Sequence, residues 1–223
     1  MFDAKVALGT WSWGSGKNGG DQVFGNHLNQ KDLQAVVDSA MANGLNLWDT
    51  AAAYGEGSSE TLLGNCLKPY SRDEYFLSTK FTPVFASSGA DPVSDMLNGS
   101  LKRLHTDYID LYWIHNSDDV EKWTPKMIPL VKKGVIKHVG VSNHNLDQVK
   151  RVNDILNAGG IKLDAVQNHY SLLHRQSEDT GLLDYCHQNG ITFFPYMVLE
   201  QGVLTGKHDA VHPFEGDNNR ART

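Results

Sequence analysis

Short apolar segments alternate with amphipathic segments along the whole chain, in units of about 30 residues, the length of a strand-plus-helix unit. In segment 92–104, for example, the apolar residues are spaced by three and four positions, as on one face of a helix. Strands are expected at 6–11, 45–48, 75–79, 108–114, 136–141, 164–167 and 192–196. Helices are expected at 32–43, 59–67, 92–104, 119–133, 146–156 and 181–189. The alternation predicts a parallel β/α architecture.

About seven strands and six helices in this rhythm predict an α/β fold, a TIM-type (β/α)₈ barrel. No linker divides the chain, so residues 1–223 are expected to form a single domain. The helix at 59–67 is expected to begin with Ser58 or Ser59 as its N-cap. A doubly wound open sheet is the alternative fold, but no Gly-x-Gly-x-x-Gly pattern follows a predicted strand.

The acidic composition argues against some classes of partner. A net charge of −6 disfavours nucleic acid and anionic membrane surfaces, because both attract basic faces. The two cysteines, Cys66 and Cys186, give no disulfide framework, as expected in a reducing compartment. No apolar run approaches the ~18 residues of a membrane span. These features predict a soluble, cytoplasmic protein.

Four polar residues stand out because they lie at or just after the ends of predicted strands. Asp49 follows an apolar strand, Tyr54 lies five residues further on, and Lys80 and His115 follow the next two strands. The carboxyl ends of barrel strands meet on one face, so these side chains are expected to face one pocket. A buried lysine needs a charged partner, which Asp49 can supply. Structural roles are the alternative, as a turn cap for Asp49 or as packing residues for Tyr54 and His115.

The segment 49–64 has the pattern Asp-Thr-Ala-x-x-Tyr-Gly followed by Ser-Glu-x-x-Leu-Gly, and it resembles the active-site segment of the aldo-keto reductases. Further segments of that family occur in family order at 8–11, 78–80, 107–111, 140–143, 167–168 and 196–207. The resemblance therefore extends over nearly the whole chain. It implies reduction of an aldehyde or ketone to an alcohol by hydride transfer from NADPH, with NADH possible and no metal.

The resemblance implies catalytic roles for Asp49, Tyr54, Lys80 and His115. Carbonyl reduction requires an acid for the oxygen and a group that stabilises the developing charge. A tyrosine hydroxyl has an unperturbed pKa of about 10, so the Lys80 ammonium is expected to lower the pKa of Tyr54. Asp49 would keep Lys80 charged, and His115 would orient the substrate oxygen.

Cofactor contacts are expected mainly at the ends of later strands. Ser142, Asn143 and Gln167 would hold the nicotinamide amide, because hydroxyls and amides can meet both its carbonyl and its NH₂ group. Tyr196 resembles the family residue whose ring stacks on the nicotinamide. The rest of the implied cofactor set is Thr10, Trp11, Asp49, Met197, Leu199, Gln201 and Lys207.

The loop 197–207 resembles the family segment that wraps the cofactor pyrophosphate, with Gly202 and Gly206 allowing close backbone approach. It departs from the commonest pattern, because Met-Val-Leu-Glu-Gln stands where Ser-Pro-Leu is frequent. Hydroxyl contacts to phosphate are therefore in doubt, and Glu200 is expected to point away from the phosphate.

Trp11, Tyr54, Phe81 and His115 are expected to contact the substrate, since an aromatic lining suits an apolar aldehyde or ketone. Further candidates are Trp13, Trp113 and Asn116, although core filling is the alternative for the two tryptophans. The substrate itself and the oligomeric state cannot be read from the sequence, because substrate loops vary within such folds.

Two other functions remain open. A regulatory protein like the potassium-channel β-subunits, which share this fold and the same four residues, would bind the cofactor and show no turnover. A lyase would instead use Lys80 to form a Schiff base with a carbonyl substrate.

The family fold has eight strands, and the last helix, strand and helix are expected to be missing. The tail 208–223 has no apolar period that could replace them. The first and seventh strands would then be open edges. In the family, the eighth strand and the following helix also bind the adenosine 2′-phosphate. We therefore expect weak NADPH binding with little preference over NADH.

Overall fold

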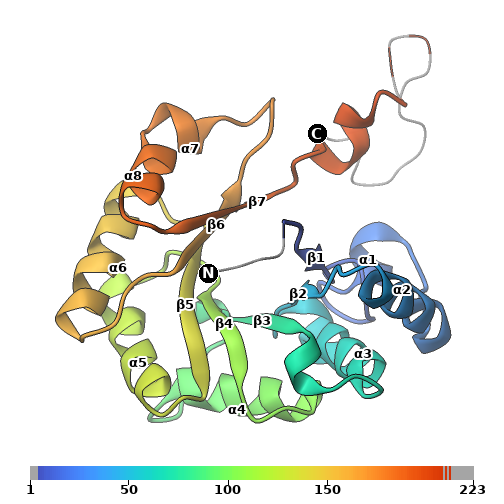
Figure 1. Cartoon of the computed structure of the whole chain (residues 1–223), viewed down its shortest axis with the longest axis horizontal. Helices are drawn as coiled ribbons and strands as arrows, with labels where there is room; N and C mark the ends of the chain where they lie inside the picture. The colour runs from blue at the N-terminus through green and yellow to red at the C-terminus, as the bar shows by residue number, and fades with distance from the viewer. Residues whose placement is uncertain (1–4, 208, 210, 212–223) are drawn as a thin grey trace.

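The computed structural model describes residues 5–207, 209 and 211, which contain one sheet of seven parallel strands. The strands are β1 (Leu8–Gly9), β2 (Leu47–Asp49), β3 (Phe76–Phe81), β4 (Ile109–Ile114), β5 (Ile136–Ser142), β6 (Ala165–His169) and β7 (Thr192–Tyr196). Their order across the sheet is their order in the chain. A doubly wound sheet reverses its order at a switch point, so that alternative is wrong. Figure 1 shows a curled sheet with helices outside it, which confirms the predicted β/α-barrel class.

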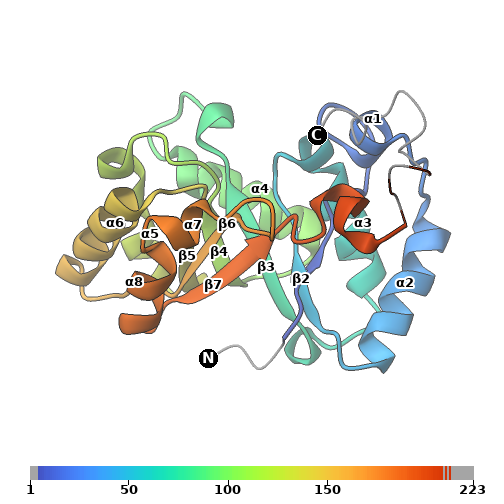
Figure 2. The same ribbon diagram turned by 90° about the horizontal axis from the view of Figure 1, so that it is seen from above.

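The helices lie between successive strands, on the outer side of the sheet (Figures 1 and 2). The α-helices are α1 (Gly20–Phe24), α2 (Gln30–Ala42), α3 (Ser58–Leu67), α4 (Pro92–Leu104), α5 (Val120–Lys132), α6 (Leu146–Ala158), α7 (Gln176–Asp179) and α8 (Leu182–Gln188). The 3₁₀ helices are η1 (Tyr54–Gly57), η2 (Arg72–Glu74), η3 (Pro83–Phe85) and η4 (Glu200–Thr205). The sequence pattern predicts six of the α-helices. It misses α1 and α7, whose five and four residues are too few to show a helical period.

The start of α3 differs from the prediction. Its N-cap is Gly57, which has a φ of 93° and makes no side-chain cap. The Ser58 hydroxyl donates to the carbonyl oxygen of Ser15 (2.8 Å), and the Ser59 hydroxyl donates to that of Thr10 (2.7 Å). The two serines are therefore not caps, because their hydroxyls tie the first turn of α3 to the segment that follows β1.

Strand β3 continues two residues beyond its predicted end. Lys80 and Phe81 pair with Trp113 and Ile114 of β4, so Lys80 lies inside the strand and not after it. Successive residues of a strand point to opposite faces. The side chains of Lys80 and Phe81 therefore cannot enter the same cavity.

The main apolar core lies between the sheet and its helices, and a smaller cluster groups Leu111, Trp113 and Ala165 with Phe194. Trp113 is fully buried, as core filling requires. It packs over Gly140, its neighbour in β5, where a Cβ atom would lie 2.2 Å from the Trp113 ring. Only glycine leaves room for the Trp113 ring at that position.

Among the described residues, no helix is long and apolar enough to cross a membrane. The expectation for the tail 208–223 concerns residues outside the described part of the chain, apart from Asp209 and Val211.

Candidate active site at the carboxyl ends of the strands

A cavity of about 610 Å³ opens over the carboxyl ends of the strands. The predicted catalytic residues Asp49, Tyr54 and His115 line it, and Lys80 lies fully buried below them. The remaining lining residues are Gly9, Trp11, Ser12, Asn18, Ala53, Thr82, Val84, Phe85, Asn116, Ser142, Asn143, Gln167, Tyr196 and Met197.

The carboxylate of Asp49, the last residue of β2, is the centre of the polar network. Four side chains donate hydrogen bonds to it: Lys80 Nζ (2.6 Å) and Gln167 Nε2 (3.2 Å) to Oδ2, and Ser78 Oγ (2.5 Å) and Trp113 Nε1 (3.1 Å) to Oδ1. A buried carboxylate requires such compensation. Trp113 thus has a polar role in addition to the predicted packing role.

The ammonium of Lys80 is held in its charged form. Its Nζ donates to Asp49 and to the carbonyl oxygen of Thr50 at 2.8 Å. Burial alone lowers the pKa of Lys80, but the paired Asp49 carboxylate, with a smaller contribution from Tyr54, outweighs burial and raises the pKa above its ordinary value. A Schiff-base lysine attacks as the neutral amine, so this environment disfavours the lyase hypothesis.

Tyr54 opens η1, and its half-buried ring stacks on Trp11 with a centroid distance of 6.1 Å. The Nζ atom of Lys80 lies 5.2 Å from the Tyr54 ring centroid. Burial raises the pKa of Tyr54, and the nearby ammonium lowers it by less, so the net shift is upward. Lys80 therefore lowers the pKa of Tyr54 as predicted, but by too little to bring it below its ordinary value. Desolvation of the phenolate is the stronger effect.

His115 follows β4, and its ring meets the Tyr54 ring edge-on with a centroid distance of 5.8 Å. Burial and, second, the charge of Lys80 lower the pKa of His115 to about 3, so the imidazole is neutral. Its Nδ1 lies 2.9 Å from the hydroxyl of Thr82.

The tautomer of His115 follows from the surroundings of Thr82, which is 3% exposed. In the described structure, the Thr82 hydroxyl has no other hydrogen-bond partner than the Nδ1 atom of His115. A buried hydroxyl donates where an acceptor is available. Donation by Thr82 leaves the imidazole proton on Nε2.

Ser142 and Gln167 lie side by side at the ends of β5 and β6. They are register partners, and both line the cavity. Gln167 uses its NH₂ group on Asp49. No hydrogen bond between described residues uses the Gln167 carbonyl oxygen or the Ser142 hydroxyl proton. One free acceptor and one free donor match the NH₂ and carbonyl groups of a carboxamide.

Asn143 is already engaged with its neighbours. Its Nδ2 donates to the His115 carbonyl oxygen (2.9 Å) and to Ser142 Oγ (3.2 Å), and its Oδ1 accepts from the Tyr196 hydroxyl (2.6 Å). Asn143 therefore connects the end of β5 to His115 and to the Tyr196 ring at the end of β7.

Several predicted contact residues lie elsewhere. Thr10 is fully buried, with its hydroxyl between the Asp49 carbonyl oxygen and Ser59. The fully buried Phe81 packs on Trp123 of α5 at 5.0 Å, because it points to the helix side of β3. The substrate contact predicted for Phe81 is therefore wrong, and Thr10 has no side-chain access to a cofactor. The predicted cofactor residues that do not line the cavity also include Leu199, Gln201 and Lys207, whereas Met197 does line it.

The lining residues that the sequence analysis did not predict include Thr82, Val84 and Phe85. Thr82 had a usable signal, because it stands two positions after Lys80 and so faces the same side of the strand. Val84 and Phe85 lie in η3 and are 74% and 44% exposed. Nothing in their local pattern marks them. No group of three or more His, Cys, Asp or Glu side chains in the described residues could hold a metal ion.

The sequence of this chain is similar to those of known reductases. The model of the Aldo/keto reductase family matches residues 5–223. Aldo-keto reductase YhdN of Bacillus subtilis (strain 168) is 34% identical over 227 residues, which covers 97% of this chain and 65% of that protein. The NADH-specific methylglyoxal reductase of Escherichia coli (strain K12) is 30% identical over 225 residues, which covers 91% of this chain and 66% of that protein.

Solved structures show the same likeness. An aldo-keto reductase from Klebsiella pneumoniae in complex with NADPH superimposes with a TM-score of 0.73 at 28% identity, covering 91% of this chain and 67% of that one. The thermostable aldo-keto reductase Tm1743 in complex with epalrestat gives a TM-score of 0.77 at 29% identity. The match covers 90% of this chain and 70% of that one. The chain spans 65% and 66% of the length of the two curated relatives above. Since the family model matches nearly all of the chain, this protein belongs to the aldo/keto reductase family.

Proposed function

We propose that this protein reduces an aldehyde or ketone to an alcohol with NADPH or NADH, and that Tyr54 is the general acid. One observation carries the proposal: a neutral phenol, a buried ammonium–carboxylate pair and a neutral imidazole converge on one cavity. A relative named NADH-specific methylglyoxal reductase, and structural neighbours solved with NADP or NADPH, support it.

Each residue of the site has a separate role in this reaction. A reduced nicotinamide, when bound, supplies the hydride that the carbonyl carbon accepts. Tyr54 gives its proton to the carbonyl oxygen, and the Lys80 ammonium stabilises the negative charge that remains on the phenolate. His115, with its proton on Nε2, donates a hydrogen bond to the same oxygen. The Ser142 hydroxyl and the Gln167 carbonyl would hold the nicotinamide amide, and the ring of Tyr196 would stack on it.

Thr82→Val should remove the hydroxyl that fixes the tautomer of His115. We expect kcat/KM for carbonyl reduction to fall by about threefold to tenfold, the effect of one hydrogen bond. Thr82→Ser keeps the hydroxyl and should stay near wild type. The ¹⁵N chemical shifts of His115 report the tautomer directly, with Nε2 protonated in the wild type. A wild-type imidazole protonated on Nδ1 would contradict the assignment.

The pH dependence of reduction follows from the two pKa shifts. The protonated form of Tyr54 is the active form, and burial holds the pKa of Tyr54 above its ordinary value of 10.0. His115, with a pKa of about 3, does not titrate in the working range. We therefore expect kcat/KM to be constant from about pH 5 to about pH 9 and to fall only at higher pH. A loss of rate with a midpoint near pH ~7 would show a different acid.

A regulatory protein that only binds cofactor is the second candidate, because the same four residues fit it. Turnover of a reactive aldehyde at saturating cofactor separates the two. Reductase function predicts oxidation of NADPH or NADH, whereas binding of cofactor without oxidation favours the regulator. Borohydride trapping of a carbonyl compound on Lys80 would instead support a lyase.

The finer expectations for this chain are proposals of the same kind. We propose a small apolar carbonyl substrate, because Trp11, Val84 and Phe85 line the cavity. Weak NADPH binding with little preference over NADH stays a prediction, and the two dissociation constants test it. A cytoplasmic location and a single domain also stay predictions.

A further inference from the structure

The loop 197–207 has an unusual backbone. Met197, Glu200 and Gln201 have φ values of 55°, 46° and 52°, so three non-glycine residues within five positions occupy the left-handed region. Such conformations persist only where surrounding contacts hold them, and they concentrate at functional sites. This loop therefore needs contacts with other parts of the fold to hold its backbone.

The carboxylate of Glu200 supplies the main contact. Glu200 is 8% exposed, and its Oε1 accepts from His169 Nε2 at 2.8 Å and from the Ser171 hydroxyl. The Ser171 oxygen also accepts from the backbone N–H groups of Leu173 (3.1 Å) and His174 (3.0 Å). Glu200 is thus tied to the turn that follows β6. The hydrogen bond from Ser171 and, after it, the contact with His169 lower the pKa of Glu200, so it is ionised at neutral pH.

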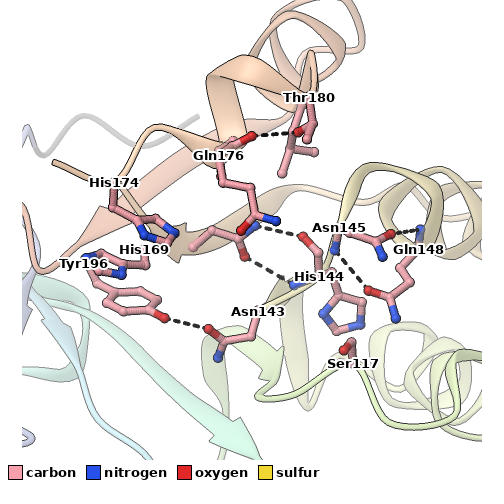
Figure 3. A pocket seen from close by; sticks show the side chains of 13 residues that line it. Ser117, Asn143, His144, Asn145, Gln148, His169, His174, Gln176, Thr180 and Tyr196 are labelled. Atoms are coloured by element: carbon pink, nitrogen blue, oxygen red, sulfur yellow. Dashed lines mark hydrogen bonds between the residues drawn. The ribbon is translucent and has the colours of Figure 1, made fainter. Parts of the chain in front are cut away.

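A stack of three rings extends from this contact toward the active site (Figure 3). His169 stacks on His174 with a centroid distance of 4.0 Å and on Tyr196 with a centroid distance of 5.5 Å, and both pairs are within 17° of parallel. The Tyr196 hydroxyl then donates to Asn143 (Figure 3). Glu200 therefore fixes the orientation of His169, which supports one face of the Tyr196 ring.

Tyr196 borders two cavities. It lines the active-site cavity and also a second, polar cavity of about 460 Å³, shown in Figure 3. His169 and His174 line only the second cavity. The histidine stack therefore supports Tyr196 from the side of the second cavity, while Tyr196 also borders the active-site cavity.

We propose that Glu200 is a positioning residue, which holds the Tyr196 ring and the 197–207 loop in the geometry that binds the nicotinamide cofactor. This inference rests on the proposed function. It also explains the acidic residue in a loop expected to approach phosphate. The Glu200 carboxylate is satisfied by His169 and Ser171, so its charge is turned into the protein.

Glu200→Ala removes both hydrogen bonds, and cofactor affinity should fall on the order of tenfold. The kcat at saturating cofactor should change by less than about twofold, because the proton donor and its partners are untouched. Glu200→Gln keeps an acceptor oxygen for His169 and Ser171 and should recover most of the affinity. Glu121→Ala is the matched control, since this glutamate is paired with Arg151, lines neither cavity and should leave cofactor affinity unchanged.

Amide hydrogen exchange without cofactor supplies the second readout. Glu200→Ala should speed exchange in 197–207 on the order of tenfold, with α4 amides as the reference for global stability. Unchanged exchange would overturn the anchoring role, and faster exchange with unchanged cofactor affinity would overturn the positioning role. Failure of the wild type to bind either cofactor would overturn the proposed function, while the exchange data would still decide whether Glu200 anchors the loop.

Discussion

Tyr54→Phe should abolish carbonyl reduction and leave cofactor affinity within about twofold of wild type. A positioned general acid contributes about 10²–10⁴-fold to rate, and no other described side chain in the cavity combines a protonated hydroxyl with an adjacent ammonium. Phenylalanine keeps the ring that stacks on Trp11. The structural change is therefore confined to one oxygen atom. Steady-state turnover and fluorescence titration of the cofactor measure the two effects separately.

Tyr70→Phe is the matched control for this experiment. Its hydroxyl donates to Asp38 at 2.7 Å, outside the cavity, so the same chemical change should leave turnover unaffected. Turnover by Tyr54→Phe within a few-fold of wild type would remove Tyr54 as the acid.

Lys80→Met should cost both stability and activity. The ammonium is fully buried and is paired with Asp49 at 2.6 Å. Removing one partner of a buried ion pair costs about 3–5 kcal/mol, because the other charge is left uncompensated. Loss of the charge beside Tyr54 should also reduce turnover by about 10²-fold or more. Denaturant unfolding and turnover measured below the unfolding midpoint give the two quantities.

A double variant separates the two effects of Lys80. Asp49→Asn combined with Lys80→Met leaves no uncompensated buried charge, and it should recover most of the lost stability. Turnover should stay low, because the ammonium is still absent. Recovery of activity together with stability would mean that Lys80 acts only by keeping the barrel folded.

The longer helices were predictable because each has enough residues to show a helical period, and the strands because each lies in a short apolar segment. Helix α4, at Pro92–Leu104, has the predicted bounds. Helices α1 and α7 were missed because their five and four residues are too few to show a helical period. The N-cap of α3 was misplaced because the hydroxyls of Ser58 and Ser59 bind distant backbone, which local pattern does not reveal.

Position at strand ends brought the predicted catalytic residues together, and this much could be read from the chain. The direction of the pKa shift of Tyr54 could not be read from the chain, because it depends on how strongly burial opposes the charge of Lys80. The wrong substrate contact for Phe81 could have been avoided, because a Lys80 side chain that points into the barrel requires the next residue to point toward the helices. The partners of Glu200 lie 29 and 31 positions away and needed the fold.

The most direct test of the central claim follows the hydride. Wild-type protein is incubated with an aldehyde and a dihydronicotinamide cofactor that carries deuterium at the transferring carbon, and the alcohol is analysed by mass spectrometry and NMR. We predict one deuterium on the carbinol carbon for the wild type, and no labelled alcohol above background for Tyr54→Phe. Bound cofactor with no deuterium in the product, or equal labelling by the two proteins, would contradict the account.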